Sequence, residues 1–266
     1  MNRRWVVKAG SNLIVSGGPL LLRAWMQQVD SLKRIHGIEV IWVTSGAIAS
    51  AKERLWRSPI GKRIARSRHH DLAEKQALSA IGQPVIMDLY NLALQSVSLT
   101  GAQILLTYDD LVSRARRKNF VNTVEKLLAL GVVPILNEND AVATEEIRFG
   151  DNDTLSARVA AAACADRLVI LTDVDGVFDA DPAKKKSAKL IARVERITAS
   201  VLKKAGSRSA SGRGTGGMLS KLLAAREAGR HGIETYLVKG DAFSVLTRLA
   251  EGHAVGTRIL PSRGRR

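Results

Sequence analysis

The chain has 266 residues, of which 45% are hydrophobic and 25% charged, and its formal net charge is +16. This balance excludes a chain disordered along its whole length and allows one large α/β domain with a full core. No apolar run reaches the roughly 18 residues that cross a bilayer, and the N-terminal apolar stretch is too short for a signal peptide. We therefore expect a soluble protein. Its single cysteine, Cys164, favours a reducing, cytoplasmic setting and is expected to be buried among alanines.

The positive charge gathers in four clusters, which are Lys52–Arg68, Arg114–Lys118, Lys184–Lys186 and Arg263–Arg266. One interpretation is nucleic-acid binding, because lysine and arginine neutralise phosphates. The other is a solvated surface that also draws anionic substrates toward the protein. Apart from Trp56, no aromatic residue interleaves with these clusters to stack on bases, and this favours the second interpretation.

Short stretches rich in Val, Ile and Leu alternate with helical patterns along the whole chain. The strand-like stretches are Arg4–Lys8, Glu39–Val43, Gln103–Thr107, Val132–Leu136, Leu168–Thr172 and Glu234–Val238. The helix-like stretches are Leu21–His36, Ala73–Ser96, Asn119–Leu130, Asp153–Ala163 and Met218–His231. Gly37, Gly131 and Gly232 each follow a helix and precede a strand, where a left-handed residue is expected. Repeated β-α-β units predict an α/β fold, a three-layer α/β/α sandwich around a mainly parallel sheet.

Two segments, Arg54–His70 and Lys203–Gly214, are basic or rich in Gly and Ser and show little periodicity. We expect both to be mobile.

Polar segments follow the strands, where open α/β sheets bind their ligands. They are Lys8–Asn12, Thr44–Ala47, Asn137–Asp140, Gly150–Thr154, Thr172–Gly176 and Gly212–Gly217. Each is a weak signal alone, but their recurrence at successive strand or helix ends predicts one site along a common edge of the sheet.

The glycine run Gly212–Gly217 formally matches G-x-G-x-x-G, but polar residues precede it where a dinucleotide-binding fold needs a buried strand. Met218 stands where a phosphate loop has lysine. The run still provides a flexible approach to a helix N-terminus, with Lys221 able to reach an anion there. The alternative is a mobile surface loop followed by a solvent-facing lysine.

Three further residues also have two interpretations. Lys8 ends a buried strand, where it either meets an anion or emerges at the sheet edge. Taken alone, Asp153 is better explained as a helix N-cap, and Asp173 as a turn former.

Together, these segments resemble the amino-acid kinase family over nearly the whole chain. The matching segments are Val6–Ser11, Val43–Ile48, Lys75–Gln83, Gln103–Thr107, Val133–Val142, Gly150–Asp153, Leu171–Asp173 and Gly214–Met218 with Lys221. The Lys-x-Gly-Ser and Thr-Ser-Gly-Ala motifs indicate only the wider family. The order of Asn137–Asp140 and Gly150–Asp153 resembles the branch that phosphorylates glutamate.

The resemblance implies roles for individual residues. Lys8 and Lys221 would contact the transferring phosphates, and Asp153 would hold the two lysines in place. The positions that match glutamate binding are Ser45, Asp140 and Asn152, with Asn137 and Asp151 nearby. The positions that match nucleotide binding are Lys8, Thr172, Asp173, Thr215, Gly216, Gly217, Met218, Leu219, Ser220 and Lys221. The segment Arg54–His70 falls where the family has a loop near the substrate.

The resemblance also implies ATP with Mg²⁺ as cofactors, L-glutamate as acceptor in the first step of proline synthesis, and no metal site built from protein side chains. It further implies a homodimer or homotetramer, inhibition by proline, and no membrane or nucleic-acid partner. Many members carry a C-terminal domain also found in RNA-modifying enzymes, and this chain stops before it. We expect a catalytic domain over residues 1–261 and a basic tail over residues 262–266.

A carboxylate acceptor is already ionised at neutral pH, so its attack on a phosphate requires no general base. The five histidines show no catalytic or metal-ligand spacing, which agrees with this chemistry. Two alternatives stay open. A related kinase acting on acetylglutamate, aspartate, carbamate or UMP would keep the ATP half of the site. A basic nucleic-acid-binding protein on the same scaffold would lack ATP turnover.

Overall fold

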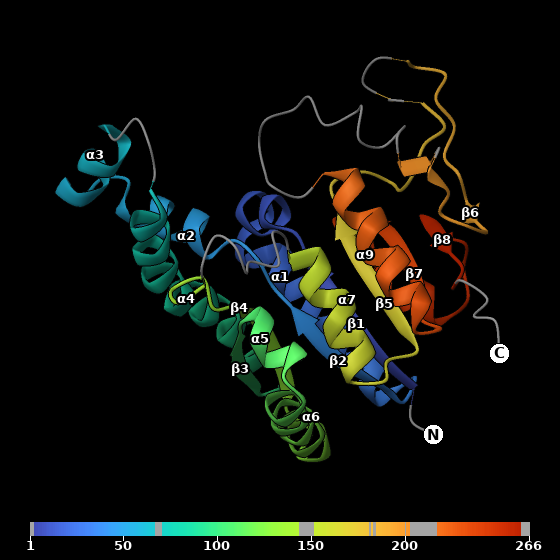
Figure 1. Ribbon diagram of the computed structural model, residues 1–266, viewed down its shortest axis with the longest axis horizontal. Helices are drawn as coiled ribbons and strands as arrows, with labels where there is room; N and C mark the ends of the chain where they lie inside the picture. Colours follow the sequence, from blue (N-terminus) through green and yellow to red (C-terminus); the bar gives the residue numbers. More distant parts are fainter. Residues whose placement is uncertain are drawn as a thin grey trace.

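The computed structural model describes residues 3–66, 71–143, 152–180, 182, 185–199, 201–202 and 217–261. Its strands form one sheet in the order β3-β4-β2-β1-β5-β7-β8-β6 (Figure 1). They are β1 (Arg3–Ala9), β2 (Ile38–Val43), β3 (Gly101–Leu106), β4 (Val133–Glu138), β5 (Arg167–Thr172), β6 (Arg193–Val194), β7 (Glu234–Lys239) and β8 (Thr257–Ile259). All neighbouring strands run parallel except β7 and β8, so the predicted mainly parallel sheet is confirmed.

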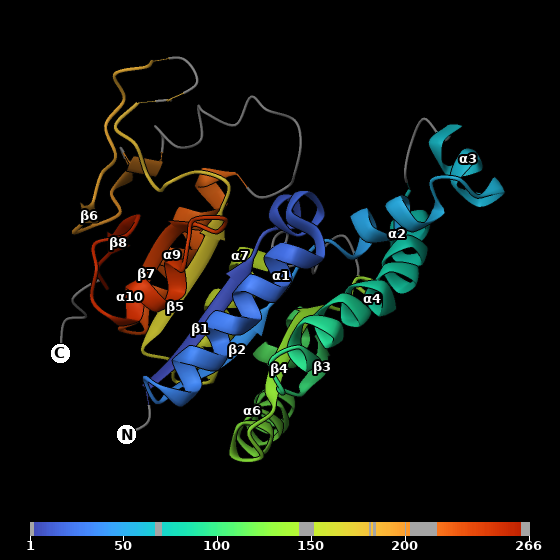
Figure 2. The same cartoon turned by 180° about the vertical axis from the view of Figure 1, so that it is seen from behind.

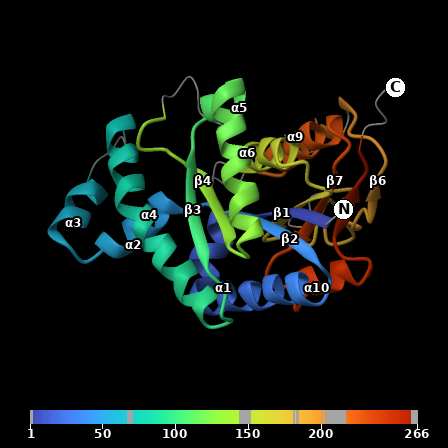
Figure 3. The ribbon, with the colours of Figure 1, turned by 90° about the horizontal axis from the view of Figure 1, so that it is seen from below.

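Helices cover both faces of the sheet. They are α1 (Ser11–Arg34), α2 (Ala47–Leu55), α3 (Pro59–Arg66), α4 (Leu72–Gln95), α5 (Tyr108–Val112), α6 (Arg114–Ala129), α7 (Asn152–Ala162), α9 (Met218–Arg230) and α10 (Val245–Ala250). Seen from below, α1 and α10 lie on one side of the strands, while α5, α6 and α9 lie on the other (Figure 3). The three-layer sandwich is confirmed. None of the described helices is both long enough and apolar enough to cross a bilayer.

Two hydrophobic cores, one on each side of the sheet, explain why the strands read as nearly continuous apolar runs. In β1, Val7 packs into the core beneath α1, α4 and α10, and its neighbour Val6 packs into the core beneath α6, α7 and α9. Both side chains are fully buried. A strand with helices on both faces has no polar face to show, so alternation disappears from its sequence.

An aromatic cluster in the first core supports the end of β2. Trp25 and Trp42 lie 5.5 Å apart between ring centroids, and Trp42 Nε1 donates a hydrogen bond of 2.8 Å to the Tyr90 hydroxyl. Thr44 Oγ1, just beyond β2, lies 3.0 Å from the same hydroxyl. Burial raises the pKa of Tyr90 to about 12, against the lowering effect of the hydrogen bonds to Thr44 and Trp42. The phenol is therefore neutral and links the core to the loop after β2.

All predicted strands and helices are present, and the omissions are short elements. Sequence reasoning missed α2, α3, α5, α10, β6 and β8. The predicted first helix covers only the part of α1 after a kink, because Gly18 (φ 54°) is non-helical and Pro19 follows it. The three glycines expected to close helices do have positive φ, with Gly37 at 60°, Gly131 at 75° and Gly232 at 78°.

The segment Arg54–His70, which is expected to be mobile, includes α3 (Pro59–Arg66), and this helix projects with α2 from the body of the domain (Figure 2). One expectation needs correction. Cys164 is exposed, not buried, because the chain takes a left-handed turn there (φ 50°) that directs its side chain away from the alanines. The segment Lys203–Gly214 and the tail 262–266 lie outside the described residues.

Gly82 allows α4 to approach α2 closely. A Cβ atom at this position would lie 1.8 Å from the carbonyl oxygen of Ala47. We expect Gly82→Ala to lower the free energy of unfolding by about 1–3 kcal/mol, because α2 must shift to relieve the overlap. Urea denaturation measures this. Without the overlap, the substitution in a helix would stabilise by about 0.5–1 kcal/mol, so a stabilised variant would contradict the close approach.

Candidate active site

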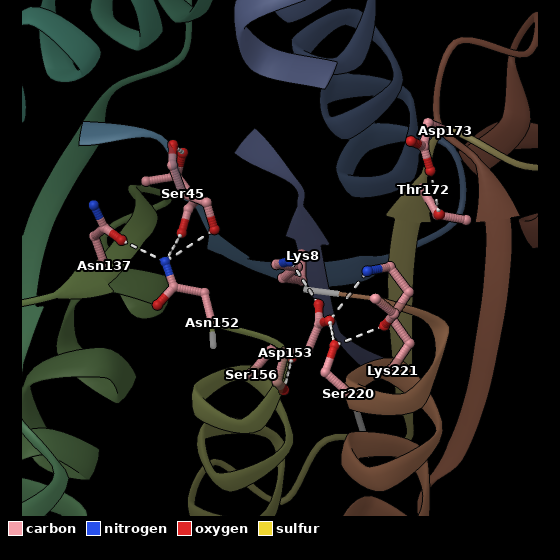
Figure 4. Close-up of polar contacts among 12 residues, drawn as sticks. Lys8, Ser45, Asn137, Asn152, Asp153, Ser156, Thr172, Asp173, Ser220 and Lys221 are labelled. Carbon is pink, nitrogen blue, oxygen red and sulfur yellow. Dashed lines mark hydrogen bonds and ion pairs between the residues drawn. The ribbon is translucent and has the colours of Figure 1, made fainter. Parts of the chain in front are cut away.

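The parallel strands β1, β2, β4 and β5 are adjacent, so their carboxyl ends meet at one edge of the sheet. Lys8 lies near the end of β1, Asn137 near the end of β4, and Ser45 directly after β2. Helix α7 begins at the same edge, where it contributes Asn152 and Asp153 (Figure 4). Lys221 comes from the first turn of α9. The predicted common edge therefore brings together residues that are far apart in the sequence.

The carboxylate of Asp153 lies between two lysines (Figure 4). Lys8 Nζ is 2.5 Å from Asp153 Oδ1, and Lys221 Nζ is 3.2 Å from Oδ2. The hydroxyl of Ser220 donates to the same Oδ2 at 2.8 Å. Asp153 is completely buried, and only 3% of Lys8 and 7% of Lys221 is exposed. Two positive charges thus meet one negative charge inside the protein, and a second anion is the natural complement to such a group.

The pKa of Asp153 shows whether burial or the neighbouring charges and hydrogen bonds have the larger effect on its carboxyl group. Burial by itself raises the pKa of the carboxyl, but the charges of Lys8 and Lys221 and the hydrogen bonds from Lys8 and Ser220 outweigh it. The net result is a pKa well below the ordinary value, so the carboxylate stays ionised. The two ammonium groups therefore keep a permanent negative partner.

These contacts decide between the two interpretations that the sequence allows for each of Lys8, Lys221 and Asp153. Lys8 does not emerge into solvent at the sheet edge, and Lys221 is buried rather than solvent-facing. Helix α7 begins at Asn152, so Asp153 lies in its first turn, and its side chain pairs with the lysines.

A cluster of amides lies beside the lysines, on the β2 and β4 side. Asn152 Nδ2 is 2.8 Å from the carbonyl oxygen of Thr44, 2.9 Å from Ser45 Oγ and 2.7 Å from Asn137 Oδ1. Since Asn152 and Asp153 are consecutive, the first turn of α7 connects this cluster to the paired lysines. Asp140, the remaining described residue expected to bind the acceptor, contacts Ser79 Oγ at 3.1 Å.

The described residues expected to bind nucleotide come from the end of β1, the end of β5 and the start of α9. Thr172 ends β5, Asp173 follows it, and their side chains contact each other at 3.2 Å (Figure 4). Gly217 precedes α9, while the partly buried side chains of Met218 and Leu219 pack against the second core. Asp151, Thr215 and Gly216 were also expected in the site and lie outside the described residues.

Three contacts in this geometry were not predicted from the sequence. Ser220 was grouped with the nucleotide segment, but its hydroxyl bonds to Asp153. Thr44 contributes its backbone carbonyl, which no side-chain motif reveals. Gln83 accepts a hydrogen bond of 3.0 Å from Asn137 Nδ2. Its place at the end of the family-like segment Lys75–Gln83 was the only available signal.

Mg²⁺ in nucleotide sites is held mainly by phosphates and water, with one or two carboxylates. The described residues contain no group of three or more His, Cys, Asp and Glu side chains that could hold a metal ion. This donor set is compatible with an ion that arrives bound to a nucleotide.

The fold and this site define a known class. A model of the amino acid kinase family matches residues 3–239, and the chain belongs to this family. It is 45% identical over 264 residues to the glutamate 5-kinase of Nitrosospira multiformis, covering 97% of this chain and 68% of that protein. It is 43% identical over 263 residues to the glutamate 5-kinase of Trichlorobacter lovleyi, covering 98% and 68%. The UMP kinase of Bacillus anthracis has the same fold, with a TM-score of 0.63 at 17% identity, over 98% of this chain and 96% of that one.

Asp153→Asn would leave two buried ammonium groups without their shared carboxylate. We expect the free energy of unfolding at pH 7 to fall by about 3–5 kcal/mol. Because the pKa of Asp153 is depressed in the folded state, its contribution is present above the unfolded-state pKa of about 3.9 and is lost as the pH falls through the folded-state pKa. The difference between wild type and variant should therefore narrow below about pH 4.

Urea denaturation at pH 7, 5 and 3 measures this difference. Glu227→Gln is the matched control, because it breaks a more exposed ion pair with Arg230 (2.8 Å) and should cost no more than about 1 kcal/mol. If both variants lost the same free energy of unfolding, burial would not make the Asp153 ion pairs more stabilising than an exposed pair.

Proposed function

We propose that this chain transfers the γ-phosphoryl group of ATP to the γ-carboxylate of L-glutamate, forming γ-glutamyl phosphate in the first step of proline synthesis. One observation carries the proposal. Lys8 and Lys221 converge on Asp153 directly beside the amide cluster around Asn152. Relatives named glutamate 5-kinase at 43–45% identity support the choice of acceptor.

In the proposed mechanism, the two lysines neutralise the transferring phosphoryl group. Transfer of a phosphoryl group depends on positioning and charge stabilisation rather than on a covalent protein intermediate. Lys8 and Lys221 come from elements on either side of Asp153, which holds their ammonium groups within reach of one phosphate. Mg²⁺ bound to the nucleotide would add positive charge at the same phosphates.

The acceptor half would be formed by the amide cluster. Asn152 contacts both Ser45 and Asn137, and Asp140 and Asp151 follow from the family pattern. The γ-carboxylate of glutamate is ionised at neutral pH, so it attacks the γ-phosphorus without a general base. On the other side, Thr172, Asp173 and residues 215–221 would bind the nucleotide.

The remaining family properties are part of the same proposal. We place the enzyme in the cytoplasm, as a homodimer or homotetramer that uses ATP with Mg²⁺ and is inhibited by proline. Its catalytic domain would extend over residues 1–261. The competing acceptors are N-acetylglutamate, aspartate, carbamate and UMP, and the likeness to a UMP kinase at 17% identity is one of fold alone.

An ADP-release assay with several acceptors tests the proposal. Purified protein is incubated with Mg·ATP and with glutamate, N-acetylglutamate, aspartate, carbamate or UMP, and a coupled enzyme reports ADP. We expect glutamate to give the highest kcat/KM. If another acceptor is phosphorylated and glutamate is not, the enzyme has a different substrate within its family. If no acceptor is phosphorylated, the proposed activity is wrong.

Removing either lysine tests the mechanism. Loss of a preorganised charge on the transferring group costs about 2.7–4 kcal/mol in the barrier, so Lys8→Ala and Lys221→Ala should each lower kcat on the order of a hundredfold or more. Lys33→Ala is the control, since Lys33 lies at the end of α1 and donates to the carbonyl oxygen of Gly131 at 2.5 Å, remote from the site. Near-normal kcat in both site variants would exclude the proposed roles.

A further inference from the structure

Gln83 is a buried glutamine for which the proposed mechanism has no role. It comes from α4 and is 6% exposed. Its Oε1 accepts from Asn137 Nδ2 at 3.0 Å, and its Nε2 donates to the carbonyl oxygen of Glu138 at 3.2 Å. Both ends of one amide are thus used on two consecutive residues at the end of β4.

Backbone groups determine which way each amide in this cluster points. The N–H of Glu138 can only donate, so the atom of Asn137 that lies 3.0 Å from it is Oδ1, and Nδ2 is left for Gln83. The carbonyl of Thr44 can only accept, so the atom of Asn152 that lies 2.8 Å from it is Nδ2. The orientations follow from groups whose polarity cannot be exchanged, unlike an amide facing water.

The orientation of Asn152 has a chemical consequence. Its Nδ2 is directed to three acceptors, which are Thr44 O, Ser45 Oγ and Asn137 Oδ1. Within the described part of the chain, all hydrogen bonds of the Asn152 side chain are made by Nδ2 and none by Oδ1, and the residue is only half-buried. An amide oxygen can only accept, so it attracts a group that can only donate. The α-ammonium group of an amino acid is such a group, with three N–H donors.

We propose that Gln83 is a positioning residue that holds Asn137 and, through it, Asn152, so that Asn152 Oδ1 faces the α-ammonium group of the acceptor. The inference rests on the proposed function and deepens it, because it explains how the site selects an α-amino acid among dicarboxylates. Gln83 itself contacts no substrate. Its influence passes through the hydrogen bonds of 3.0 Å to Asn137 and 2.7 Å from Asn152 to Asn137.

The test compares glutamate with glutarate, which has the same two carboxylates but no amino group. The wild-type protein should prefer glutamate in kcat/KM on the order of a hundredfold or more, because glutarate leaves the carbonyl of Asn152 without a donor. In Gln83→Met, which keeps the side-chain volume but loses the hydrogen bonds to Asn137, Glu138 and Gln103, this preference should fall about tenfold. The KM for ATP should change less than about twofold, since the lysine contacts remain.

Two further variants separate positioning from a general effect of losing a buried amide. Gln28→Met removes a glutamine that is 8% exposed, donates to the Ala24 carbonyl and accepts from the Leu246 N–H at the α10 end of the fold. It should keep the wild-type preference. Gln83→Glu keeps an oxygen for Asn137 Nδ2, so its preference should lie nearer to wild type than that of Gln83→Met. If Gln83→Met does not fold, the glutamate preference of Gln83→Glu tests the proposal in its place.

The possible failures are distinguishable. No turnover of glutamate by the wild-type protein would overturn the proposed function and this inference together. Wild-type turnover with an unchanged glutamate preference in the folded Gln83 variants would overturn this inference alone. An equal loss of preference in Gln28→Met would also overturn it.

Discussion

The carboxylate of Asp153 is the group on which the site depends. It meets Lys8 and Lys221 at 2.5 Å and 3.2 Å and so joins β1, α7 and α9 at one buried point. Removing one partner from a buried ion group costs several kcal/mol, because the remaining charge cannot return to water. Two ammonium groups around one carboxylate also leave an attraction for a further anion. Stability and ligand binding therefore draw on the same three side chains.

The first turn of α7 connects the two halves of the proposed site. Asp153 orients the lysines, and its neighbour Asn152 directs its amide nitrogen to Thr44, Ser45 and Asn137. Consecutive residues near the start of a helix point in different directions, so one short segment reaches both clusters. A single rigid element thus sets the distance between the place where phosphate would bind and the place where the acceptor would bind. Such preorganisation is what phosphoryl transfer requires.

The aromatic core extends this rigidity to the loop after β2. Trp42 and Thr44 both contact the hydroxyl of Tyr90, which burial keeps neutral. Thr44 in turn presents its carbonyl oxygen to Asn152. The chain of contacts runs from a packed interior to the amide cluster without an exposed step. Side chains in such surroundings keep one rotamer, and this is why the geometry of the cluster is well defined.

The sequence by itself determined the order of the major strands and helices and the three-layer class, and it indicated polar segments at the strand ends, among them those that contain Lys8 and Asn137. Buried parallel strands and amphipathic helices leave local patterns, and the ends of strands such as Lys8 and Asn137 can be read directly. It could not determine α3 or the exposed position of Cys164, because neither follows from local periodicity. The local pattern alone favoured Asp153 as a helix cap, and only the family resemblance implied its pairing with Lys8 and Lys221, which the tertiary structure shows. That Gln83 reaches Asn137 was decided by the tertiary structure alone. These contacts join residues far apart in the chain, and their energy depends on burial, which arises only when the layers pack together.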